Sequence, residues 1–190
     1  MDILIKRLKA YLIDLIVLIL LLSIVALIYH PDITSYQSRL NELQGDYLIG
    51  DINFGTYIHE NSKIMKIIDE KSIFLNLLNL FIVIIYFIIV PYFSNGFTLG
   101  KRFNHIRIRA IKKEKLTLKK LIVRSMIING LLYFIGVIIC SIVVPKDYYF
   151  FVISSISFIQ IIVIVISIFL MFKRKDRRGL HEVLSKTYVK

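Results

Sequence analysis

The chain has 190 residues, of which 57% are hydrophobic, and its formal net charge is +12. An ordinary soluble domain is only about 45–50% apolar, so this composition argues against a purely water-soluble protein. Apolar runs long enough to cross a bilayer take up about half of the chain, which leaves no room for a separate enzyme domain. We therefore expect a single transmembrane domain over residues 1–190.

The apolar runs occur four times along the chain, and each exceeds the length of an ordinary strand. In chain order they cover residues 10–29, 73–93, 121–144 and 148–172. Apolar runs of this length favour helices, which satisfy their own backbone hydrogen bonds in lipid. The sequence therefore predicts an all-α, polytopic membrane protein with four transmembrane helices. The first run follows basic residues as a signal peptide does, but its length and the lack of a clear cleavage site indicate an uncleaved anchor.

The distribution of basic residues predicts the orientation of these helices. Residues 1–9, 94–120 and 173–190 carry three, nine and seven basic side chains against one, one and two acidic ones, whereas residues 30–72 carry four basic and seven acidic. Because cytoplasmic segments retain an excess of Lys and Arg, we expect both termini in the cytoplasm and 30–72 outside it. In an alternative interpretation, the turn at 145–147 belongs to a re-entrant segment and does not connect two spanning helices.

Two connecting segments have patterns of their own. The extracytoplasmic segment 30–72 is either a small ordered cap or a solvated connector that ends in the amphipathic stretch 61–71. Residues 106–111 alternate apolar and polar side chains, residues 112–115 form a charged turn, and 116–118 alternate again. This pattern predicts a short cytoplasmic β-hairpin between the second and third helices.

Two ionisable residues, Asp14 and Arg124, lie inside the predicted helices. A charge near the bilayer centre costs at least about 2.5–3.5 kcal/mol on insertion scales. The two residues lie at similar depth from the cytoplasmic side, so we expect them to form an ion pair. Arg7 lies on nearly the same helix face as Asp14, and we expect its side chain to extend to the lipid headgroups. This group is either a lock between helices or part of a transport site. Near the middle of the fourth helix, Gln160 is a candidate for a hydrogen bond between helices.

No motif in the sequence supports catalysis or metal binding. The four histidines fall on both predicted sides of the membrane, which argues against a shared metal site, and there is no phosphate loop or serine elbow. The single cysteine, Cys140, lies in an apolar run. We expect no cofactor, no metal and no nucleic-acid partner, because positive-inside topology and anionic lipid at the cytoplasmic face account for the basic clusters.

Three segments together resemble the RDD family of bacterial membrane proteins. Arg7, Ala10 and Asp14 match the family's opening Arg-x-x-Ala-x-x-x-Asp. The second segment is similar to its G-x-T-x-G-K-R turn, and the third resembles its closing R-x-L-H-D-x-x-x-x-T-x-V, with Glu182 in place of the second aspartate. The residues that carry these two matches are Gly96, Thr98, Gly100, Lys101, Arg102, Arg178, Leu180, His181, Thr187 and Val189.

The resemblance implies a bacterial cell-membrane protein of a mostly uncharacterised family, some members of which are associated with sodium or proton exchange. The resemblance also implies that the motif residues form one polar cluster at the cytoplasmic end of the bundle. Its members would be Arg7, Asp14, Lys101, Arg124, His181 and Glu182. Our first hypothesis is a non-catalytic accessory, scaffold or assembly partner that binds a homo-oligomeric copy or another membrane protein. The alternative is a transport-related protein that exchanges cations for protons through Asp14 with Arg124.

Overall fold

The computed structural model describes residues 3–111 and 114–190, and most of them are helical. The helical elements in chain order are α1 (Ile3–Ile28), α2 (Thr34–Ile49), α3 (Phe54–Lys71), α4 (Ile73–Ile84), the π-helix η1 (Ile85–Ile89), α5 (Val90–Phe93), α6 (Leu99–Phe103), α7 (Leu118–Ile128), α8 (Leu131–Val143), the 3₁₀-helix η3 (Lys146–Tyr148), α9 (Tyr149–Lys173) and α10 (Leu180–Leu184). Two strands, β1 (Ile108–Ala110) and β2 (Thr187–Val189), complete the described elements.

Three helical segments of the described chain are long and apolar enough to cross a membrane. They are Ile3–Ile28, Ile73–Phe93 and Lys146–Lys173. The second comprises α4, η1 and α5, so a π-helical turn lies inside it. These segments agree with the first, second and fourth predicted helices, and the protein is a multi-pass membrane protein.

The third predicted helix is broken. α7 and α8 meet at an angle of 76°, so the expectation of one continuous helix over residues 121–144 is wrong. The break falls at Asn129 and Gly130, and Gly130 has the left-handed φ of 71° that glycine adopts without strain. Gln160 of α9 donates a hydrogen bond of 2.8 Å to the carbonyl of Ile127, which satisfies one of the carbonyls at the end of α7. Four spans result only if the bent pair counts as one span.

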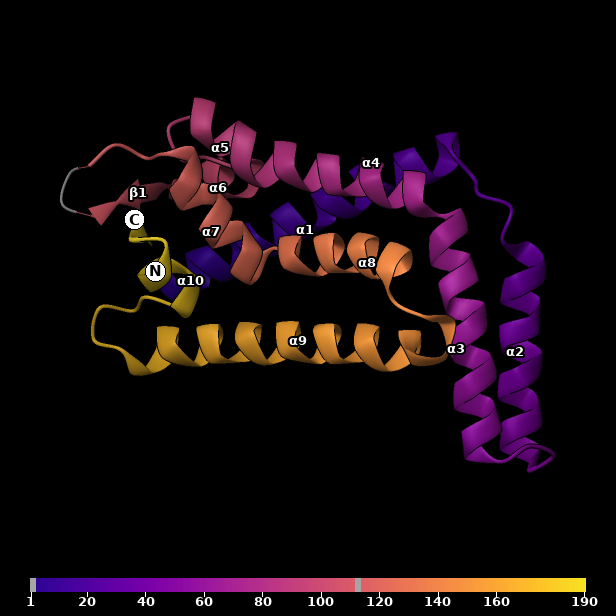
Figure 1. The fold of residues 1–190 in the computed structure, drawn as a ribbon. Helices are drawn as coiled ribbons and strands as arrows, with labels where there is room; N and C mark the ends of the chain where they lie inside the picture. Colours follow the sequence, from indigo (N-terminus) through magenta and orange to yellow (C-terminus); the bar gives the residue numbers. More distant parts are fainter. Residues whose placement is uncertain (1–2, 112–113) are drawn as a thin grey trace.

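Residues 34–71 form a pair of antiparallel helices, α2 and α3, which fits the ordered-cap reading of this segment. α2 ends at Gly50 in the left-handed conformation, and Asn53 caps α3 by accepting a hydrogen bond from the backbone N–H of Thr56 at 2.9 Å. α3 lies across the ends of α4, α8 and α9, at the opposite end of the molecule from both chain termini (Figure 1).

Polar side chains of α3 attach it to the turn between α8 and α9. The Ser62 hydroxyl donates to the carbonyl of Lys146 at 2.5 Å and accepts from the backbone N–H of Phe150 at 2.9 Å. Lys66 donates to the carbonyl of Val144. These bonds cap backbone groups at a helix junction, and together with the buried Ile58 and Ile64 they hold α3 there.

The expected β-hairpin, in which residues 106–111 pair with 116–118, is wrong. β1 pairs antiparallel with β2 at the C-terminus, with Ile108 opposite Val189 and Ala110 opposite Thr187. The alternation in residues 106–111 did mark a strand, because Ile108 and Ala110 are buried and Arg109 between them is exposed. The pairing thereby joins the C-terminal segment to the connection between α6 and α7, beside the N-terminus (Figure 1).

Candidate functional site

The short helix α6 lies directly against α1, and small residues permit this contact. Ala10 of α1 is 1% exposed. A Cβ atom placed on Gly100 of α6 would lie 2.1 Å from the carbonyl oxygen of Ala10 and 2.9 Å from the carboxylate carbon of Asp14. Only glycine fits at this position, so the spacing of Ala10 and Asp14 on one face of α1 matches the α6 backbone.

Asp14 accepts four hydrogen bonds in this contact. Its Oδ1 accepts from the Tyr86 hydroxyl at 2.7 Å and the Gly100 backbone N–H at 2.8 Å. Its Oδ2 accepts from the Thr98 hydroxyl at 2.6 Å and the Lys101 ammonium at 3.0 Å. The Asp14 side chain is 1% exposed. Each oxygen of this buried carboxylate therefore accepts two hydrogen bonds.

The turn before α6 is shaped to bring Thr98 and Lys101 to Asp14. Gly96 has a φ of 92°, and a Cβ atom there would lie 2.1 Å from the carbonyl oxygen of Ile108. Thr98 occupies the N-cap position of α6, where its Oγ1 also accepts a bond from the Lys101 ammonium at 3.0 Å. Burial lowers the pKa of Lys101, while the adjacent Asp14 carboxylate acts in the opposite direction.

Glu182 is the centre of a second polar network. Its Oε2 lies 3.3 Å from Arg7 Nη1 and accepts the Gly179 backbone N–H at 3.1 Å, and its Oε1 lies 3.7 Å from Arg124 Nη1. The side chain of Glu182 is 1% exposed, and those of Arg7 and Arg124 are 10% and 9% exposed. One carboxylate is therefore shared by two nearly buried guanidinium groups.

The same two arginines hold the C-terminal segment. Arg7 donates to the backbone carbonyls of Val189 at 2.5 Å and Arg177 at 2.7 Å. Arg124 donates to Thr187 Oγ1 at 3.2 Å. The first helix, the broken helix and the C-terminal strand are thus joined through side chains from both ends of the chain.

His181, next to Glu182 on α10, contacts α9. Its Nδ1 lies 2.5 Å from Ser167 Oγ, and its ring is buried. Burial, reinforced by the positive charge of Arg124, Arg7 and Lys101, lowers the pKa of His181 well below its usual value. The imidazole is therefore neutral near pH 7.

Asp14 and Arg124 do not form the expected ion pair. Asp14 pairs with Lys101, and Arg124 with Glu182. Equal depth on two helices did not bring the two side chains together, because α6 inserts its own cation against α1. Arg7 likewise does not extend to the headgroups but turns inward to Glu182. The expected convergence of the motif residues at one end of the bundle is seen, although as two networks.

Several partners of these residues were not foreseen. Tyr86 lies in the π-helical turn η1, and its hydroxyl is aimed at Asp14. Ser167 contacts His181, and the hydroxyls of Ser185 and Thr187 lie 2.7 Å apart. A lone tyrosine in an apolar run is an ordinary feature of membrane helices, so nothing in the sequence marks Tyr86 as a partner of Asp14, whereas the serines of the fourth apolar run, Ser167 among them, are candidates for hydrogen bonds between helices.

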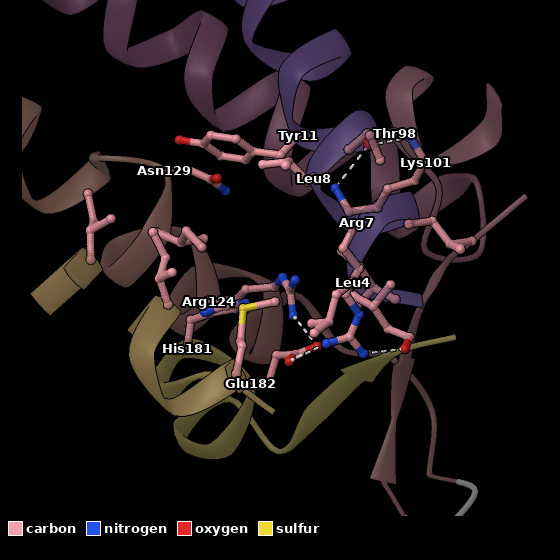
Figure 2. Close-up of a pocket in the computed structure, with 18 of the residues that line it drawn as sticks. Leu4, Arg7, Leu8, Tyr11, Thr98, Lys101, Arg124, Asn129, His181 and Glu182 are labelled. Atoms are coloured by element: carbon pink, nitrogen blue, oxygen red, sulfur yellow. Dashed lines mark hydrogen bonds and ion pairs between the residues drawn. The ribbon is translucent and has the colours of Figure 1, made fainter. Parts of the chain in front are cut away.

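A cavity of about 370 Å³ lies beside the two networks. Figure 2 shows Arg7, Lys101, Arg124 and Glu182 around it, with Leu4, Leu8 and Tyr11 of α1 on one side. Its wall also contains Thr98, Asn129 and His181, and four residues of α9, namely Ile164, Ile168, Met171 and Phe172. Among the described residues, no group of three His, Cys, Asp or Glu side chains is placed to hold a metal ion.

Comparison with known proteins identifies a family. The model described as the RDD family matches residues 3–186, nearly the whole chain, which confirms the resemblance carried by the three motifs. Neither a curated protein nor a solved structure matches the chain.

Proposed function

The chain belongs to the RDD family, and from this premise we propose that it is a non-catalytic protein of the bacterial cell membrane that acts as an accessory, scaffold or assembly partner. The observation that carries this proposal is the set of four hydrogen bonds to Asp14. In this reading the residues of the family motifs form a lock that holds the fold together.

The saturation of Asp14 argues against ion exchange at this residue. The two oxygens of a carboxylate offer about four lone-pair sites, and Tyr86, Thr98, Gly100 and Lys101 use that number. A cation would have to displace the Lys101 ammonium and break bonds from three further donors. Cation–proton exchange through Asp14 with Arg124 also assumed that the two side chains contact each other, and they do not.

The second carboxylate of the site is engaged mainly through one oxygen, because Glu182 Oε2 accepts from Arg7 and Gly179, whereas the buried Oε1 lies 3.7 Å from Arg124 and accepts no hydrogen bond from the described residues. Glu182 faces both Arg7 and Arg124 and caps the first turn of α10 through Gly179. A proton or cation carrier must release its charge partner during each cycle, whereas breaking a buried pair costs about 3–5 kcal/mol. The geometry therefore favours a permanent structural role for both carboxylates.

The other end of the molecule offers a surface for a partner. α2 has no buried residue and packs on α3, which itself attaches to α8 and α9. The partner in this proposal is a second copy of the chain or another membrane protein. We infer from the basic excess near the termini and the positive-inside rule that this end lies in the cytoplasm, in contact with anionic lipid, and that α2 and α3 lie outside.

Reconstituted liposomes test this proposal. We expect proteoliposomes with a trapped pH indicator to respond to an imposed Na⁺ or K⁺ gradient no more than empty liposomes do. Asp14→Asn should lower the thermal stability of the purified protein. Glu42→Gln is the control, because Glu42 is an exposed carboxylate on α2, and it should leave stability unchanged. An ion-driven pH change that Asp14→Asn abolishes and Glu42→Gln retains would overturn the proposal.

A further inference from the structure

The cavity beside the two networks opens between two membrane-spanning helices. Its long walls come from the first turns of α1 and the last turns of α9. Leu8 at this site is 60% exposed and Phe172 is 71% exposed. Because both helices are apolar enough to span a membrane, large exposed apolar side chains at the opening face lipid tails and not water.

The closed end of the cavity carries more positive than negative charge. Arg7, Lys101 and Arg124 line it, and each of their side chains is at most 14% exposed. Asp14 compensates Lys101, but Glu182 alone faces both arginines. Within the part of the chain that the structure describes, these three cations thus meet two carboxylates. A nearly buried charge without a counterion is costly.

Hydrogen-bond donors at this end are also left open. Arg124 uses one nitrogen, Nη1, for both Thr187 and Glu182, and its Nε and Nη2 donate to no described residue. The Nε of Arg7 is buried and has no partner among the described residues. The planar guanidinium fork is suited to bind the oxygens of a phosphate or carboxylate.

We propose that this cavity is a lateral binding site for an anionic phospholipid, whose phosphate pairs with Arg124 and Arg7 while its acyl chains lie between α1 and α9. The charge of the headgroup supplies the missing counterion, and the apolar rim selects an amphiphile over a free anion. The volume of about 370 Å³ is that of a small ligand site, so it takes the headgroup and the first part of a chain. This inference is independent of the proposed function.

The absence of tryptophan from the sequence makes a direct binding assay possible. Phe172→Trp places a single tryptophan at the rim of the cavity, and its emission is excited selectively over that of tyrosine. In nanodiscs, brominated phosphatidylglycerol should quench it at a mole fraction about fivefold lower than brominated phosphatidylcholine, as expected for one basic contact to an anionic headgroup. Phe158→Trp, which lies on the exposed face of α9 away from the cavity, should be quenched equally by both lipids.

Two variants of the Phe172→Trp protein separate the charge from the cavity. Arg124→Gln should remove the preference for phosphatidylglycerol. Ile164→Phe changes no charge but fills part of the cavity, and it should weaken the preference as well, so the proposal stays testable if Arg124→Gln does not fold. Ile159→Phe makes the same change at a lipid-facing position of α9 that does not line the cavity, and it should preserve the preference.

Three results would overturn the inference. One is equal quenching of Phe172→Trp by both lipids. Another is a preference that persists in Ile164→Phe. The last is reversal of the preference by inorganic phosphate but not by chloride at the same ionic strength, because this would indicate a site for a free anion.

Discussion

Gly100 and Ala10 set the distance at which α6 meets α1. The backbone N–H of Gly100 reaches Asp14 at 2.8 Å only because no side chain lies between the two helices. The charged residues of the family motifs thus depend on the small ones, since the four donors reach the carboxylate together only at this separation.

Gly100→Ala tests this dependence. The added methyl group would lie 2.1 Å from a backbone oxygen, so the helices must separate, and we expect a loss of about 1–3 kcal/mol in the free energy of unfolding. Gly45→Ala is the control, because Gly45 lies inside α2 with open space around it, and it should be neutral or stabilising by about 1 kcal/mol. Thermal unfolding in detergent measures both. Equal stability of the two variants would be evidence against the close contact.

His181 makes stability depend on pH. Burial lowers its pKa in the folded protein, whereas the unfolded chain takes up a proton near the ordinary value of about 6.5. The unfolded state therefore binds more protons below this pH. We expect stability to be full above about pH 6.5 and to decline below it until the pH reaches the lowered pKa.

The unfolding temperature between pH 5 and pH 8 measures this effect. His181→Gln removes the titrating ring while keeping a polar group opposite Ser167, so it should flatten the decline below pH 6.5. His59→Gln, at a half-exposed position of α3, should leave the decline in place. An unchanged pH dependence in His181→Gln would assign the effect to another group.

At the level of elements, the C-terminal strand contributes more to the fold than its length suggests. Thr187 and Val189 are buried, and Tyr188 between them is not. We expect Val189→Lys to cost at least about 2 kcal/mol, because it places a charge in a buried apolar position. Tyr188→Lys, one residue away on the other face of the strand, should cost less than about 1 kcal/mol. Similar losses of thermal stability for the two variants would contradict the observed register.

The sequence predicted the elements that depend on local pattern. Residues 73–93 and 148–172 are helical because length and apolarity alone decide a spanning helix. Alternation also located β1. The partner of β1 lies about eighty residues away, and a three-residue strand contains too little pattern to identify it. The break at Gly130 was missed because the apolar residues on its two sides together reach the length of a span, although the Asn129-Gly130 pair is a turn signal and Gly130 adopts a left-handed φ.

The site was predictable in its members but not in its pairing. Asp14 and Arg124 were identified because charge inside an apolar run is costly. Their actual partners, Lys101 and Glu182, come from short segments outside the spans. Depth along a helix does not tell which segment folds back against it, so the pairing required the three-dimensional structure.

At the scale of the whole molecule, the two ends differ in construction. Both termini, α10 and the strand pair lie at one end, and α2 and α3 lie at the other (Figure 1). We expect the end with the termini to be cytoplasmic, because the connecting and terminal segments there carry the excess of Lys and Arg.

Single-cysteine labelling tests this orientation. With Cys140, the single cysteine of the chain, replaced by alanine, we expect Ser35→Cys on α2 to react with a membrane-impermeant maleimide on intact cells. Lys175→Cys, an exposed position after α9, should react only after the membrane is permeabilised. Labelling of Lys175→Cys on intact cells would reverse the assigned orientation.

The central claim is that the charged residues of the family motifs form a structural lock, and a double-mutant cycle on Asp14 and Lys101 measures it most directly. We expect Asp14→Asn and Lys101→Met each to lower the free energy of unfolding by about 3–5 kcal/mol, because each leaves an uncompensated buried charge. The double variant should cost at least about 1 kcal/mol less than the sum of the two, since neither charge is then left alone. Additive losses, or an Asp14→Asn variant as stable as the parent protein, would contradict the lock.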